Sequence, residues 1–397
     1  MTTSETSSIL RKDNGAFASH ISDMKLFPML AAASTAAILL TGCGALDQLG
    51  AKTQFSVELP EKFELEDAVD VHCAFDPAEH SEWYDDVCNQ ILNYQMSVSI
   101  PENLKHSAAP WFIDSVMMDH PDAFWISTYY KSSTAKTTDF RFELNDKIDK
   151  DKLSEMHQQL LDKADEIISM IPDGASDYDK ALFVHDYIAK NSEYDHPAAA
   201  DPDVNPMAFN AYGCLIEGKC VCAGYARAYS LILKRLGIEC CYSWGYPYSG
   251  ESHAWNYVMI DGKYYWVDVT WDDMDAENDG GPAVVHTYFM INDDMLRRTR
   301  KSEWEQIFAP ECSSTDLNYH VKNGTFFTGY DKDSVASAIS AQKDNGCAEI
   351  MFADYDSYCS ALTGLFGKGD IYKGIDVKSD TFKYYRDDRM YTLYFIF

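Results

Sequence analysis

The chain has 397 residues and a formal net charge of −30, with 46% hydrophobic and 14% aromatic residues. This length and apolar content predict two or three folded domains with substantial cores. The negative charge argues against a nucleic-acid partner and against adhesion to an anionic lipid surface by charge. We therefore expect a soluble, secreted body.

The N-terminus predicts an exported protein. Residues 29–40 form a short apolar stretch that is too short to span a membrane and fits the core of a signal peptide. The stretch ends in Leu40-Thr41-Gly42-Cys43, which resembles a bacterial lipobox. Cys43 would then be lipidated, and two or more acyl chains anchor a protein stably. We expect a signal peptide over 1–43 and a tether over 44–60, on the extracellular face of a bacterial membrane.

Residues 61–150 read as a small mixed α/β N-terminal domain. The pattern predicts helices over 83–94 and 112–118, and aromatic-rich strands over 124–130 and 140–144. An amphipathic helix follows over 151–170.

A further helix begins near Ser176, with Asp179 three residues on in a pattern that resembles a capping box. This helix carries His185 on its apolar face. We interpret His185 as a packed core residue rather than a catalytic one.

Cys222 precedes a run of apolar residues at helical spacing that Gly237 ends. The cysteine therefore lies at or just before the first turn, where the helix dipole and free backbone N–H groups favour a thiolate. Gly224, two residues later, permits close approach of a backbone or a substrate.

Two aromatic-rich runs flank Asp261-Gly262, a strong signal for a two-residue hairpin turn. That turn predicts a register with the pairs Ile260–Lys263, Tyr257–Trp266 and Trp255–Asp268. His253 and Asp268 become diagonal neighbours on one face, close enough for their side chains to meet. Together with Cys222 they predict a nucleophilic cysteine site.

Four segments, over 178–188, 218–226, 253–256 and 261–272, together resemble the transglutaminase-like superfamily in its bacterial papain-like branch. The resemblance implies an α+β papain-like core and acyl transfer at a cysteine. It makes Cys222 the nucleophile, His253 the base and Asp268 the third member of a triad.

The oxyanion donors are a separate expectation. The backbone N–H of Cys222 is one candidate, and Asn210 or Tyr212 is a candidate side-chain donor. We expect no metal and no organic cofactor.

The chain has eleven cysteines, which is many for an exported protein. Cys220, two residues before Cys222, could form a disulfide with it or simply pack. A zinc site built from the cysteines near Cys222 is disfavoured, because their spacing is C-x-C and C-C and no histidine joins them. Cys73 and Cys88 could form a disulfide within the N-terminal domain, and the sequence does not decide whether they do.

Residues 311–397 read as a small α/β C-terminal module of β-α-β-α-β type. The catalytic domain then covers 151–310. The α+β chain would thus consist of a papain-like transglutaminase core between two small flanking domains.

The leading hypothesis is a cell-surface cysteine-dependent acyl-transfer enzyme that hydrolyses peptide or amide bonds through a Cys222 thioester. Its substrate would be a protein or peptide, including components of the cell envelope. One alternative is a protein-crosslinking transglutaminase. The other is a non-catalytic module that binds peptides or cell-wall polymer.

Overall fold

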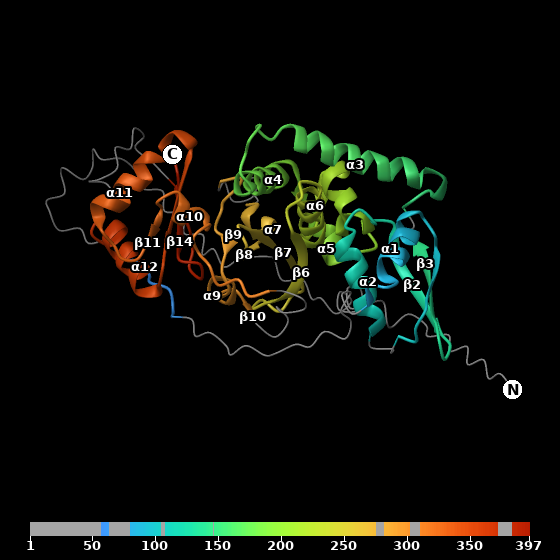
Figure 1. The fold of residues 1–397 in the computed structure, drawn as a ribbon. Coiled ribbons are helices and arrows are strands. Elements are labelled where there is room, and N and C mark those ends of the chain that lie inside the picture. The colour runs from blue at the N-terminus through green and yellow to red at the C-terminus, as the bar shows by residue number, and fades with distance from the viewer. Residues whose placement is uncertain are drawn as a thin grey trace.

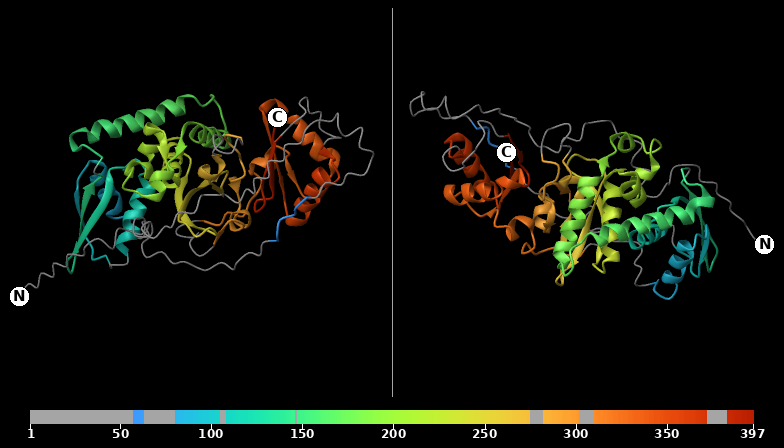
Figure 2. Two further views of the ribbon diagram at one scale, coloured as in Figure 1. Left: turned by 180° about the vertical axis from the view of Figure 1, so that it is seen from behind. Right: turned by 90° about the horizontal axis from the view of Figure 1, so that it is seen from above.

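The computed structural model describes residues 57–62, 80–104, 108–145, 147–274, 282–301, 310–371 and 383–397. The residues expected to form a signal peptide, most of those expected to form a tether, and Cys43 and Cys73 lie outside these ranges. Three units lie in a row (Figures 1 and 2): an N-terminal unit (80–145), a core unit (147–301) and a C-terminal unit (310–397). The mixed α+β class is confirmed. Within the described residues, no helix combines the length and apolar character needed to cross a membrane.

The N-terminal unit packs helices against a small antiparallel sheet. Its elements are α1 (Tyr84–Leu92), β1 (Ser97–Ile100), α2 (Ala108–Asp119), β2 (Ile126–Ser133) and β3 (Thr138–Leu144), with strand order β1-β3-β2. The predicted helices and strands are present, while β1 was not expected. Phe112 and Phe140 are fully buried in its core.

Two helices open the core unit. After a 3₁₀ turn (Lys150–Lys152), α3 (Leu153–Ser169) buries its predicted apolar side through Leu160, Ala164 and Ile167. The next helix, α4 (Asp177–Asn191), begins as expected, because the Ser176 Oγ accepts the Asp179 N–H at 3.2 Å.

Short elements lead from α4 to the nucleophile. They are β4 (Glu193–Tyr194), α5 (His196–Ala200), a 3₁₀ turn (Pro206–Phe209), a π turn (Gly213–Glu217) and β5 (Lys219–Cys220), which pairs in parallel with β4. Gly213 is required here, because a Cβ at this position would lie 2.1 Å from the carbonyl oxygen of Met207.

Helix α6 (Cys222–Arg235) packs on a five-stranded antiparallel sheet of order β10-β6-β7-β8-β9. The strands are β6 (Cys240–Pro247), β7 (His253–Ile260), β8 (Lys263–Val267), β9 (Phe289–Ile291) and β10 (Arg300–Lys301), with α7 (Val269–Asp272) and α9 (Asp293–Arg297) between them. Asp261 and Gly262 have φ of 53° and 74°, which fits the primed hairpin turn that their sequence predicts.

The predicted register is confirmed up to the end of β8. Ile260 pairs with Lys263 and Tyr257 with Trp266. The expected pair of Trp255 with Asp268 does not form, because the ladder ends at Asn256–Val267 and Asp268 caps α7 instead.

The C-terminal unit is an α/β layer on the side of the core sheet away from α6. Its elements are α10 (Tyr319–Lys322), β11 (Phe326–Phe327), α11 (Lys332–Ala341), β12 (Cys347–Phe352), α12 (Tyr355–Leu362), a π turn (Thr363–Gly367), β13 (Lys383–Asp387) and β14 (Thr392–Ile396). The strand order is β11-β12-β14-β13, with only β11 and β12 parallel. The β-α-β-α-β order expected from the sequence did not include β13, which is an additional strand in the structure.

Three consecutive residues fasten the core unit to the C-terminal unit. The backbone N–H of His286 donates to Glu349 at 2.9 Å, Thr287 bonds to the Tyr394 hydroxyl at 2.5 Å, and the Tyr288 hydroxyl donates to Asp387 at 2.8 Å. Strand β9 begins only after this segment, at Phe289.

Candidate active site

Cys222 is the first residue of α6, as predicted, and its side chain is half-buried. The preceding Val221 is extended and provides no side-chain cap; its carbonyl accepts the Gly224 N–H at 2.8 Å, and the Ala223 backbone hydrogen-bonds to the Cys222 thiol. Helix α6 comes unusually near the segment before it. A Cβ on Gly224 would lie only 2.5 Å from the Ala208 carbonyl oxygen. The close approach expected of Gly224 is therefore to backbone.

The environment of Cys222 favours its thiolate. Burial acts to raise the pKa of the thiol, but the hydrogen bond to His253 and the charge of that ring outweigh burial and lower it. Backbone groups of Ala254 and Ala223 lower the pKa of Cys222 further. A cysteine with a lowered pKa is the reactive kind.

His253 and Asp268 meet, although Asp268 reaches the ring from the cap of α7 rather than from the predicted ladder pair. The Nε2 of His253 lies 2.8 Å from Asp268 Oδ2, which leaves Nδ1 of the ring for Cys222. The imidazole stacks on Trp271, with ring centroids 4.9 Å apart and an interplanar angle of 22°. Burial lowers the pKa of His253, and the hydrogen bond to Cys222 opposes that shift.

Asp268 is held on both of its oxygens. Oδ1 accepts the Trp271 N–H at 3.2 Å, and Oδ2 accepts from His253 and from the guanidinium of Arg300. Arg300 is fully buried. Its guanidinium lies 4.1 Å from the ring centroid of Trp271 and 4.5 Å from that of Trp255. A buried cation favours the charged form of a carboxylate that faces it, which suits a group that must orient an imidazole.

Sequence reasoning missed Arg300. It follows Asp268 by 32 positions and sits in a strand of two residues. So short a strand has no periodic pattern that would mark Arg300 as buried.

Asn256 fixes the distance between the helix that carries Cys222 and the strand that carries His253. This fully buried side chain donates from Nδ2 to the Ala226 carbonyl at 2.9 Å and to the Cys241 carbonyl at 3.3 Å. One amide thus joins α6, β6 and β7 directly behind the site.

The proposed oxyanion side chains have other partners. The Tyr212 hydroxyl donates to Gln159 of α3 at 2.9 Å. The Oδ1 of Asn210 accepts the Gly213 N–H at 3.1 Å, and its Nδ2 faces the sulfur of Met207 at 3.8 Å. The structure thus gives both side chains a role in holding the segment before Cys222. The Cys222 backbone N–H remains the candidate donor.

Cys220 differs sharply from Cys222. It is fully buried beside Cys214, and burial raises the pKa of its thiol well above the ordinary value. Both Cys220 and Cys222 are free thiols in the structure. Of the two roles considered for Cys220, packing in the core is the one that agrees with its surroundings.

Aromatic side chains surround the nucleophile. Cys222 packs against an apolar cluster that includes Trp244 and Tyr246 of β6 and Tyr194 of β4. Trp111 of α2 joins the same cluster, so the N-terminal unit contributes to the surroundings of the site.

A cysteine at the start of a helix, packed on an antiparallel sheet that supplies a histidine, with an aspartate directly after the neighbouring strand, is the arrangement of the papain-like class. Residues 166–271 match the sequence profile of the Transglutaminase-like superfamily. This part of the chain is therefore a transglutaminase-like domain.

Known proteins resemble part of the chain. The human kyphoscoliosis peptidase is 30% identical over 119 residues, which cover 27% of this chain and 18% of that protein. The chain thus matches less than a fifth of the length of this relative. The crystal structure of a TGase gives a TM-score of 0.27 at 14% identity, over 45% of this chain and 52% of that one. A candidate cysteine protease from Cytophaga hutchinsonii gives 0.24 at 18% identity, over 35% and 55%. Because these TM-scores are low, the assignment of residues 166–271 rests on the match to the sequence profile of the superfamily.

Proposed function

We propose that the chain is a cysteine-dependent acyl-transfer enzyme that hydrolyses peptide or amide bonds. The observation that carries the proposal is the line of contacts from Cys222 through His253 to Asp268, closed by Arg300. A nucleophile, a base and an orienting carboxylate in hydrogen-bonded sequence are what covalent catalysis at a thiol requires.

The chemistry follows from the placement of each group. The Cys222 thiolate attacks an amide carbonyl carbon, and the Cys222 backbone N–H stabilises the oxygen that gains the negative charge. The C–N bond then breaks, and His253 donates its proton to the departing amine. His253 next removes a proton from water, which attacks the thioester and releases the acid and the Cys222 thiol.

Hydrolysis is favoured over crosslinking by one comparison, since the human relative is named a peptidase. The aromatic cluster around Cys222 suits a protein or peptide substrate with apolar side chains. With the lipobox-like Cys43, the substrate would belong to the cell envelope and the enzyme to the outer face of the membrane.

The test compares wild type, Cys222→Ala and Cys347→Ala on a glutamine-containing peptide mixture, with products identified by mass spectrometry. Cys347 is a half-buried thiol in the C-terminal unit and serves as the matched control. We expect product in water from wild type and Cys347→Ala, and none from Cys222→Ala. Added hydroxylamine should trap the acyl group as a hydroxamate.

Two results would contradict this proposal. Product that forms only when a primary amine is supplied would identify a crosslinking enzyme. Equal turnover, or equal lack of turnover, in wild type and Cys222→Ala would leave the peptide-binding module as the better account.

A further inference from the structure

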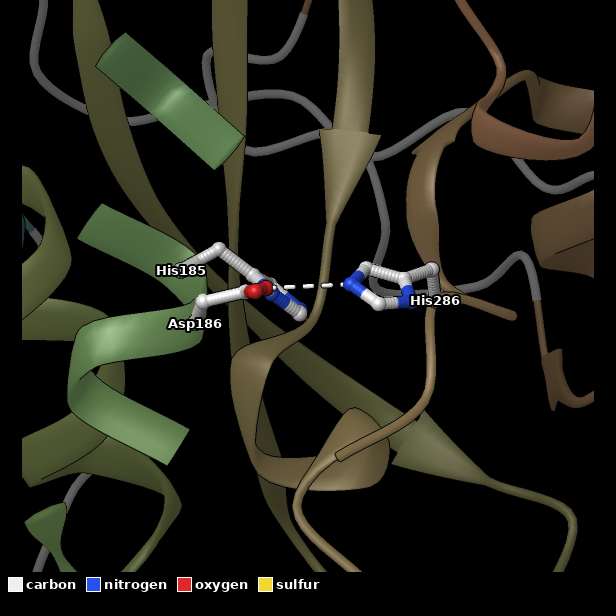
Figure 3. Close-up of side chains that lie close together, drawn as sticks. All are labelled: His185, Asp186 and His286. Atoms are coloured by element: carbon white, nitrogen blue, oxygen red, sulfur yellow. Dashed lines mark hydrogen bonds and ion pairs between the residues drawn. The ribbon is translucent and has the colours of Figure 1, made fainter. Parts of the chain in front are cut away.

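A second cluster of polar side chains lies between the core and C-terminal units (Figure 3). His185 and Asp186 are neighbours on α4, and His286 lies in the segment before β9. Among the residues that the structure describes, this is the one group of three potential metal ligands whose ligand atoms all lie within 4.8 Å of one another. Asp186 Oδ1 is 3.2 Å from His185 Nδ1 and 3.0 Å from His286 Nε2.

The outer nitrogen of each histidine faces a buried carboxylate. His185 Nε2 lies 3.1 Å from Asp272 Oδ2, and His286 Nδ1 lies 2.9 Å from Glu349 Oε1. Asp272 is fully buried and Glu349 is 5% exposed. Histidines that bind metals almost always donate their second ring N–H to such a group, which fixes the tautomer and raises the basicity of the ligand nitrogen.

Packing also fixes the two rings. His286 stacks on Tyr319 with centroids 3.9 Å apart and an interplanar angle of 9°. His185 meets the edge of Phe289 at 5.0 Å. The Asp186 side chain is 27% exposed, so an ion could enter from its side. Lys190 holds the other oxygen, Oδ2, at 3.0 Å, which leaves Oδ1 as a single ligand atom.

We propose that His185, Asp186 and His286 bind a divalent transition-metal ion, with Zn²⁺ the best match. Two imidazoles and one carboxylate are a ligand set that zinc accepts, whereas Ca²⁺ and Mg²⁺ prefer oxygen ligands throughout. Water would complete the coordination. The sequence alone did not suggest this set of ligands, because two of the residues are adjacent on a helix and the third lies 100 positions after Asp186.

The bound ion would link α4 to the segment before β9 within the core unit, and this segment contacts the C-terminal unit. His185 and Asp186 belong to a helix of the core unit, while His286 is held by Glu349 of β12 in the C-terminal unit. This proposal does not depend on catalysis at Cys222. The competing account is a metal-free ionic network of the same residues.

The test titrates the full chain, freed of metal by a chelator, with Zn²⁺ and with Co²⁺. We expect one ion per chain at this site and a rise in the melting temperature on binding. Bound Co²⁺ should show visible d–d bands without the near-ultraviolet thiolate charge-transfer band, which separates this site from the cysteines.

Three variants complete the experiment. Asp186→Asn removes a partly exposed ligand, and Glu349→Gln should weaken binding about 10–100-fold through the outer contact alone. His157→Gln is the matched control, because His157 pairs with Asp122 at 3.0 Å outside the cluster. We expect it to bind metal as wild type does.

Three outcomes would overturn the proposal. They are the absence of bound ion in wild type, equal affinity in wild type and Asp186→Asn, and a thiolate charge-transfer band as the only cobalt signal. Destabilisation of Asp186→Asn with no effect of metal on the melting temperature of wild type would identify the ionic network instead. Circular dichroism of each variant establishes that it is folded before its affinity is compared.

Discussion

At the scale of single residues, the charged forms of the site depend on burial, which disfavours them, and on neighbouring groups, which stabilise them. Burial disfavours the charged forms of Cys222 and His253: the contact with His253 nevertheless lowers the pKa of Cys222, whereas at His253 burial prevails over the contact with Cys222. Asp268 faces the buried guanidinium of Arg300. Removing a neighbour should therefore change the chemistry of the group it leaves behind. Two predictions follow from this dependence.

The first concerns the pH at which Cys222 reacts. Because its pKa is lowered, alkylation should reach half of its maximal rate at a lower pH than for an ordinary thiol, whose pKa is about 8.5. In His253→Ala burial remains while the compensating partner is lost, so the pKa should rise and labelling at pH 7 should fall at least about tenfold. Mass spectrometry of alkylated peptides measures both.

Cys359 provides an internal reference in the same samples, since burial raises the pKa of its thiol. Its labelling should be unaffected by His253→Ala. Equal pH profiles for Cys222 in wild type and variant, after mild reduction, would show that His253 does not activate the thiol.

The second prediction concerns Arg300. Replacing it with Met leaves Asp268 buried without its cation, which should lower the free energy of unfolding by about 3–5 kcal/mol. Chemical denaturation measures that loss. If Arg300 positions the triad, Arg300→Lys should recover the labelling rate of Cys222 in part.

Arg297→Met is the matched control for Arg300. Arg297 lies on the same segment, and its ion pair with exposed Asp294 is 3.4 Å long, so the variant should lose less than about 1 kcal/mol. Similar losses in both variants would contradict the importance assigned to the buried pair.

At the scale of elements, the contact between α6 and the preceding segment places the nucleophile. In Gly224→Ala, the added methyl group would meet the Ala208 carbonyl oxygen at 2.5 Å and the Cys220 Cβ at 2.6 Å. Neither atom is the end of a flexible side chain, so the helix must move. We expect a loss of about 1–3 kcal/mol in unfolding free energy and slower labelling of Cys222.

Gly329→Ala is the comparison for Gly224→Ala, because a Cβ at Gly329 would find no atom within 4 Å. Its melting temperature and labelling rate should match wild type. If Gly224→Ala also matched wild type in both measurements, tight packing at the start of α6 would not be what positions Cys222.

The sequence predicted those elements whose signals are local. The turn at Asp261-Gly262 gave the register of the hairpin, and Gly237, with φ of 76°, ends the segment of α6 as expected. Tertiary contacts decided the rest. Asp268 leaves the ladder to cap α7, and β13 is a strand because β14 pairs with it, although its sequence Lys-Tyr-Tyr-Arg-Asp alternates poorly.

At the scale of the whole molecule, stability should depend on pH through buried histidines. His320 of α10 is fully buried, with Nδ1 3.0 Å from Thr325 Oγ1, and burial lowers its pKa from 6.5 to about 4. The folded state thus binds this proton less readily than the unfolded chain does. The stability due to neutral His320 is complete above pH 6.5 and is lost as the pH falls towards 4.

Denaturant melts between pH 7 and 4 test this prediction. The free energy of unfolding should fall less steeply with acid in His320→Gln than in wild type, because the variant lacks the titrating group. Parallel curves for the two proteins would show that His320 does not contribute to the acid limit.

The segment formed by His286, Thr287 and Tyr288 has a consequence for how this architecture is inherited. The His286 N–H and the hydroxyls of Thr287 and Tyr288 bond to the C-terminal unit, while the Tyr288 carbonyl accepts the Asp268 N–H at 3.2 Å and the Tyr288 N–H donates to Asp272. A chain shortened after residue 310 would lose every partner on one side of this segment. Asp268 and the C-terminal sheet are thus coupled through this segment, and exchange of that sheet between homologous proteins should succeed only when the segment is exchanged with it.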